Sequence, residues 1–101
     1  MVKLHYAPEA RAEVIAAAEY YEGCQQGLGR RFVNAVEAAV ERVRAHPRLY
    51  PFIRRPFRRC PVRNFPHGII YRLDGEHIFV AAVAHGRRRP GYWLDRVTNH
   101  S

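Results

Sequence analysis

Ile78-Phe79-Val80-Ala81-Ala82-Val83-Ala84 is the stretch that decides the fold of this 101-residue chain. A short run that is apolar on both faces predicts a central β-strand covered on both sides. The run leads directly into His85-Gly86-Arg87-Arg88-Arg89-Pro90-Gly91-Tyr92-Trp93. Imidazole, guanidinium, phenol and indole groups can hold phosphate, transfer protons and stack on nucleobases. We therefore predict that function is located where this strand ends.

The residues before this strand predict its partners. Residues 68–73 read as a second strand, and Asp74-Gly75 matches a two-residue hairpin turn between the two. Residues 57–65 predict a more ragged strand, in which Pro61 requires an edge position or a bulge. Three prolines punctuate residues 47–57, which we predict to be a loop.

The N-terminal half predicts one strand and two helices. Apolar and polar residues alternate over residues 2–6, which indicates a short strand with one buried face. Helical spacing over residues 8–23 and again from about residue 30 to His46 predicts two helices joined by a glycine-bearing turn, an antiparallel hairpin. The chain is thus predicted to be one α+β domain, residues 1–101, in the order β-α-α-β-β-β.

The charge of the chain is strongly asymmetric. The net charge is +8; residues 1–46 are neutral, whereas residues 47–101 carry eleven arginines against three acidic residues. This placement predicts a polyanion or an acidic protein as partner. Sixteen of the seventeen basic residues are arginine, which fits either bidentate anion recognition or the codon bias of a GC-rich genome.

Cellular location and cofactors follow from what the composition lacks. No stretch of about 18 apolar residues is present to span a membrane, and the first residues lack the apolar core of a signal peptide. We therefore expect a cytoplasmic protein whose two cysteines, Cys24 and Cys60, are reduced. We expect no metal and no cofactor.

Five arginines fall within ten residues after the predicted second helix. The cluster comprises Arg54, Arg55, Arg58, Arg59 and Arg63. It predicts either a strip that binds a target protein or inhibitor, or a solvated loop and edge strand whose charges discourage pairing between molecules. Tyr20 and Tyr21 are adjacent on the first helix, so one should enter the core and the other stay partly exposed.

Several segments in this order resemble toxins of the RelE/ParE superfamily of bacterial type II toxin–antitoxin pairs. The matching segments are Ala18-Glu19-Tyr20-Tyr21-Glu22, Gly27-Leu28-Gly29-Arg30-Arg31-Phe32, His46-Pro47, Tyr50-Pro51, residues 62–72, residues 80–85 and Arg88-Arg89-Pro90-Gly91-Tyr92-Trp93. The resemblance implies a helical hairpin packed on a twisted, mostly antiparallel sheet, here of four strands. It also implies an antitoxin partner, for which we expect an acidic, apolar segment that folds on binding.

The superfamily implies two activities. RelE-like members cut messenger RNA on the ribosome, and for that activity the candidate catalytic residues are His85, Arg88 and Tyr92. His85 has the alternative role of a hydrogen-bonded residue that fixes the strand end. ParE-like plasmid-stabilisation toxins instead poison DNA gyrase. This chain has one lysine, Lys3, and no carboxylate between His46 and Asp74 to act as a base, which favours a ParE-like, non-hydrolytic toxin.

The candidate residues for contact with target or antitoxin lie in the basic C-terminal half. They are Arg54, Arg55, Arg58, Arg59, Arg63, Arg87 and Trp93. Trp93 has the alternative role of closing the core beside the sheet.

Overall fold

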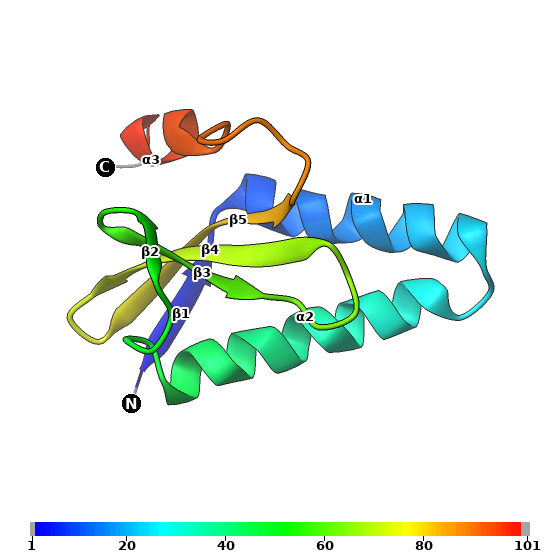
Figure 1. The fold of residues 1–101 in the computed structure, drawn as a ribbon, viewed down its shortest axis with the longest axis horizontal. Coiled ribbons are helices and arrows are strands. Elements are labelled where there is room, and N and C mark those ends of the chain that lie inside the picture. Colours follow the sequence, from blue (N-terminus) through cyan, green and yellow to red (C-terminus); the bar gives the residue numbers. More distant parts are fainter. Residues whose placement is uncertain (1, 100–101) are drawn as a thin grey trace.

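A computed structural model describes residues 2–99 of the chain as three helices and five strands (Figure 1). The elements are β1 (Lys3–Tyr6), α1 (Pro8–Cys24), α2 (Leu28–Ala45), β2 (Phe52–Arg54), β3 (Phe57–Pro61), β4 (His67–Asp74), β5 (His77–His85) and α3 (Leu94–Asn99). The class is α+β, as predicted. No helix within residues 2–99 has the length and apolar character needed to cross a membrane.

The sheet has five strands in the order β1-β5-β4-β3-β2, so the prediction of four strands was wrong. The additional strand, β2, lies inside the predicted loop 47–57 and pairs antiparallel with β3, with Phe52 opposite Arg58. Three residues between prolines are too few to show a two-residue period, which is why the pattern missed it. Strand β1 runs parallel to β5 and the remaining pairs are antiparallel.

Strand β5 lies between β1 and β4, inside the sheet, as its apolar character predicts. The hairpin that joins β4 to β5 is shifted by one residue from the prediction. Asp74 pairs with His77, so the two-residue loop is Gly75-Glu76 instead of Asp74-Gly75. Gly75 takes the positive φ, 61°, that a tight turn of this kind needs.

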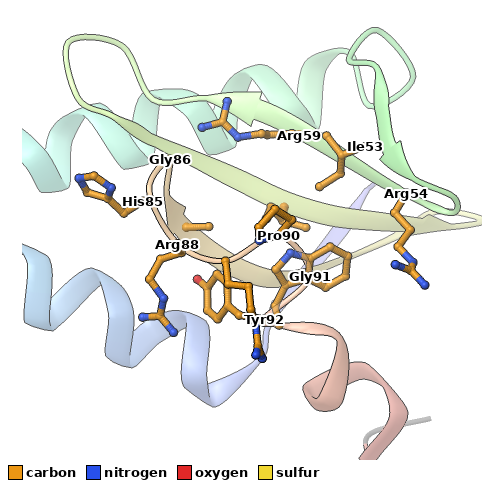
Figure 2. Close-up of a pocket in the computed structure, with 13 residues that line it drawn as sticks. Ile53, Arg54, Arg59, His85, Gly86, Arg88, Pro90, Gly91 and Tyr92 are labelled. Atoms are coloured by element: carbon orange, nitrogen blue, oxygen red, sulfur yellow. The ribbon is translucent and has the colours of Figure 1, made fainter.

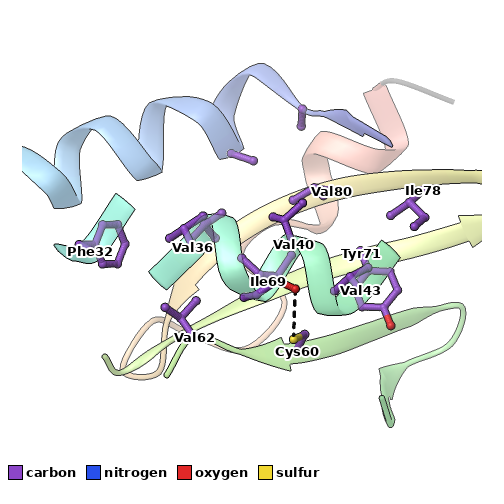
Figure 3. Close-up of a cluster of buried hydrophobic side chains, with 14 residues drawn as sticks. Phe32, Val36, Val40, Val43, Cys60, Val62, Ile69, Tyr71, Ile78 and Val80 are labelled. Carbon is purple, nitrogen blue, oxygen red and sulfur yellow. Dashed lines mark hydrogen bonds between the residues drawn. The ribbon is translucent and has the colours of Figure 1, made fainter. Parts of the chain in front are cut away.

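The helical hairpin covers one face of the sheet (Figure 1). Side chains of α2 interdigitate with those of β3, β4 and β5, as Figure 3 shows for Val36, Val40 and Ile69. Tyr21 joins this core and contacts Phe32, whereas Tyr20 is 69% exposed. The helices are therefore held by the stripe of apolar residues that their periodicity predicts.

The C-terminal segment, residues 86–99, covers part of the opposite face of the sheet. The sequence did not predict a helix or strand in it. Its helix, α3, has six described residues, too short to show helical periodicity. Trp93, which precedes α3, is 2% exposed and its ring lies 4.6 Å from that of Phe57. Ile70, Ala82 and the end of β5 complete this second, smaller core. Burial of Trp93 matches the core alternative for this residue.

Candidate functional site

A pocket of about 360 Å³ lies on the sheet face opposite the helical hairpin, where β5 ends (Figure 2). We call it the arginine pocket, because Arg54, Arg59, Arg88 and Arg89 line it together with His85. Its other walls are formed by Ile53, Ile70, Ala84, Gly86, Pro90, Gly91, Tyr92 and Trp93. No carboxylate from the described part of the chain lines it. The pocket therefore carries a concentrated positive charge over an apolar floor.

Arg59 is held in this pocket by the absence of a side chain at Gly68. A Cβ atom at Gly68 would lie 2.4 Å from the guanidinium carbon of Arg59, so only glycine leaves room for the guanidinium there. Strand pairing places Arg59 opposite Ile70, which is on the same face of the sheet. Figure 2 shows Arg59 reaching along the sheet toward the end where His85 and Arg88 lie.

Arg88 is held by the ring of Tyr92. Its guanidinium carbon lies 3.9 Å from the centroid of the ring, and that of Arg96 lies 5.0 Å from it. The Tyr92 hydroxyl donates a hydrogen bond to Oε2 of Glu13 at 2.5 Å. Burial, followed by this hydrogen bond, raises the pKa of the Tyr92 phenol, so the hydroxyl keeps its proton at neutral pH.

Glu13 ties α1 to the C-terminal segment and was not singled out by the sequence. Its carboxylate accepts two hydrogen bonds from Arg96, at 2.9 and 3.0 Å, and one from the Val83 N–H at 3.0 Å. Arg96 also donates to the Ala81 carbonyl at 3.2 Å. One signal was available in the sequence: Glu13 lies among the apolar positions of α1, four residues before Ala17. A charged residue on a buried stripe needs a partner inside the protein.

Two histidines lie side by side at the ends of β4 and β5. His67 pairs with His85 across the strands, and their ring centroids are 5.0 Å apart. His67 is buried, and its Nδ1 has no hydrogen-bond partner among residues 2–97. Burial, with a smaller contribution from His85, lowers the pKa of His67 to about 4. His67 is therefore neutral near pH 7.

His85 is anchored at the strand end, because its Nδ1 accepts the backbone N–H of Arg87 at 3.0 Å. The three candidate catalytic residues, His85, Arg88 and Tyr92, do come together. They line both the arginine pocket and a smaller hollow of about 160 Å³ that also touches Glu13 and His67. No three His, Cys, Asp or Glu side chains within residues 2–99 form a potential metal site.

The five clustered arginines do not form one continuous strip. Arg54 and Arg59 line the arginine pocket, whereas Arg58 lies on the other face of β3. There Arg58 donates hydrogen bonds to the carbonyls of Arg48 and Tyr50, at 3.1 and 2.8 Å, and holds the preceding loop. Alternation along β3 separates these side chains.

The remaining candidates lie outside the arginine pocket. Arg55 lies over the ring of Phe52, at 4.2 Å from its centroid. Arg63 and Arg87 are exposed and do not line the pocket.

Comparison with known proteins gives a family match and seven matching chains of solved structures. A family profile described as "ParE toxin of type II toxin-antitoxin system, parDE" matches residues 4–90. A solved structure titled "Chromosomal ParDE TA system from P. aeruginosa" superposes with a TM-score of 0.62 at 19% identity, covering 84% of this chain and 96% of that chain. At that identity the second likeness shows the fold alone. A search of curated proteins finds no match.

Proposed function

Since the chain belongs to the ParE toxin family of type II toxin–antitoxin systems, we propose that it inhibits growth by binding DNA gyrase in the cytoplasm. A cognate antitoxin neutralises it in this proposal. The observation that carries the proposal is the family match, which extends over nearly the whole chain, residues 4–90.

The environment of Tyr92 supports binding over hydrolysis. Its hydroxyl donates a hydrogen bond to Glu13, and the guanidiniums of Arg88 and Arg96 lie near its ring. A general acid or base must reach the reacting group with a pKa near the working pH. A phenol with a raised pKa and an internal partner is poorly suited to that role.

The test is a supercoiling assay with purified gyrase and relaxed plasmid at graded toxin concentrations. We expect supercoiling to fall as toxin rises. A protein of net charge +8 can also coat DNA, so relaxation of the same plasmid by a type I topoisomerase serves as the control. Inhibition of gyrase alone supports the proposal. Unchanged supercoiling by a preparation that is toxic in cells contradicts it.

The second candidate function is a ribosome-dependent endoribonuclease. It is favoured by the meeting of His85, Arg88 and Tyr92 around one hollow, with a second histidine, His67, beside them. Primer extension on messages after induction should then show cuts within codons. His85→Ala combined with Arg88→Ala should abolish the cuts while the circular dichroism spectrum is retained. Intact messages in toxin-arrested cells would remove this function.

A further inference from the structure

We propose that the arginine pocket receives an acidic segment of the antitoxin, with an aliphatic side chain inserted between flanking carboxylates. This inference rests on the proposed function in one respect, the existence of an antitoxin. It adds where the antitoxin binds and which chemistry it uses.

The guanidiniums of the pocket are unsatisfied and partly preorganised. None of the side chains of Arg54, Arg59, Arg88 and Arg89 has a hydrogen-bond acceptor or ion-pair partner within residues 2–97. Arg59 rests on the bare backbone of Gly68, and Arg88 rests on the ring of Tyr92. Guanidiniums held in place lose little entropy when a carboxylate binds, so such a site favours an anionic partner.

The distribution of charge along the pocket matches an acidic segment that crosses it. Arg59, Arg88 and His85 lie at one end and Arg54 at the other, as Figure 2 shows. Between them the pocket is apolar, with Ile70 and Ala84 of the sheet as its floor. A peptide segment with one aliphatic side chain between two carboxylates would match this pocket. The aliphatic group would contact the apolar centre, and the carboxylates would pair with the guanidiniums at the two ends.

The aromatic side chains argue for a peptide and against a nucleic acid. Single-stranded nucleic acids bind through bases stacked on exposed aromatic rings. Here the Tyr92 ring is covered by two guanidiniums, and Trp93 is buried against Phe57. Phe52 does not line the pocket; its ring contacts Arg58, which lies on the other face of β3. The two aromatic rings that line the pocket, those of Tyr92 and Trp93, are thus already in contact with side chains of the protein.

An edge strand beside the pocket offers backbone hydrogen bonds to a peptide. Strand β2 is the last strand of the sheet and, within residues 2–99, pairs only with β3. Its central residue, Ile53, lines the pocket and is 46% exposed. An extended peptide segment can add to such an edge while its side chains enter the adjacent pocket.

The experiment titrates the whole protein with the blocked peptide Asp-Glu-Leu-Leu-Glu-Asp. Trp93 is the only tryptophan of the chain and lines the pocket, so its fluorescence reports occupancy and calorimetry gives the affinity. The comparison probes are Asn-Gln-Leu-Leu-Gln-Asn, Asp-Glu-Ser-Ser-Glu-Asp and hexauridylate. We expect the acidic, aliphatic peptide to bind more tightly than all three.

Two variants test the geometry of the pocket. Arg59→Gln should weaken binding of the acidic, aliphatic peptide roughly tenfold, because a charge-assisted hydrogen bond is lost. Gly68→Ala should weaken it as well with no change of net charge, because the new Cβ displaces the Arg59 guanidinium. Arg31→Gln, which removes one charge from an exposed position of α2 outside the pocket, is the matched control and should bind like the wild type.

Three results would overturn the proposal. Equal losses of peptide affinity in Arg31→Gln and Arg59→Gln would show attraction by net charge alone. Tighter binding of hexauridylate would assign the pocket to nucleic acid. Absence of peptide binding to a folded protein would show that the pocket is not an antitoxin site. Because the gyrase assay contains no peptide, failure of the proposed function remains distinguishable from each of these results.

Discussion

Glu13 is the residue on which the placement of the C-terminal segment depends. Its carboxylate joins α1 to Arg96, Tyr92 and the backbone of β5. The side chains of Glu13 and Arg96 are only 17% and 15% exposed. Dissolved salt screens an ion pair in this setting only weakly. Removal of one partner leaves the charge of the other buried without a counter-charge.

Glu13→Gln should therefore destabilise the protein by about 2 kcal/mol, because Arg96 loses its charged acceptor in a half-buried site. Urea unfolding followed by circular dichroism measures the change. Glu19→Gln removes the same charge from an exposed position of α1 and should alter stability by less than about 0.5 kcal/mol. Similar losses in the two variants would show that the Glu13 network contributes no specific stability.

His67 makes stability depend on pH. Its folded pKa of about 4 lies below the ordinary value of 6.5, because burial and His85 disfavour the charged form. The unfolded chain therefore takes up this proton first as the pH falls. The contribution of His67 to stability is complete above about pH 6.5 and is lost progressively toward pH 4.

Between pH 6.5 and pH 4 we expect the wild type to lose about 2 kcal/mol more stability than His67→Leu, which cannot titrate at this position. Urea midpoints across this range measure the difference. At pH 7 the variant should be at least as stable as the wild type, because it no longer buries the unpartnered Nδ1. Parallel pH profiles for the two proteins would contradict this assignment.

The helical hairpin depends on close contact where α2 begins. Glu22, near the end of α1, accepts the backbone N–H groups of Gly27 and Gly29, at 3.0 to 3.1 Å. These two hydrogen bonds lower the pKa of the Glu22 carboxyl. They satisfy donors that the start of a helix leaves unpaired, and the negative charge suits that end of the helix.

Gly29 allows the two helices to approach. A Cβ atom there would lie 2.5 Å from the backbone carbonyl oxygen of Ala18, so one helix would have to move. Gly29→Ala should destabilise the protein by about 2 kcal/mol. Gly23→Ala, in α1 with no atom within 4 Å of the new Cβ, should stabilise it by about 0.5 kcal/mol. Thermal unfolding of the two variants measures these opposite changes in stability. If Gly29→Ala is as stable as the wild type, the two helices can accommodate a methyl group at this contact.

The two faces of the sheet have different roles in the whole molecule. The helical hairpin buries the larger core on one face. The other face is only partly covered by the C-terminal segment, and the arginine pocket lies on this face. Four guanidiniums around one hollow repel one another, and this repulsion opposes folding in the absence of a partner.

Dissolved salt should screen the repulsion between these guanidiniums. We expect the melting temperature of the free protein to rise between about 0.02 M and about 0.3 M NaCl, over which the Debye length shortens several-fold. Arg89→Gln should reduce this salt dependence more than Arg63→Gln, which removes an equal charge outside the pocket. Equal salt dependence in the two variants would show that the pocket arginines do not destabilise the free toxin.

The local features of the fold were readable from the sequence. Apolar spacing predicted α1 and α2 to within about two residues, and the apolar run of residues 78–84 predicted the interior strand β5. These predictions were confirmed because each depends on periodicity within one segment. The residue order also carried the resemblance to the toxin family that the family profile confirms.

Contacts between distant segments were decided only by the tertiary structure. Strand β2 exists because β3 pairs with it, and alternation along β3 sends Arg58 and Arg59 to opposite faces. Glu13 meets Tyr92 across 79 positions of sequence because α1 and the C-terminal segment pack at the same end of β5. A one-dimensional pattern records which residues share a helix or strand face. It does not record which faces meet, since that depends on how all the elements pack together.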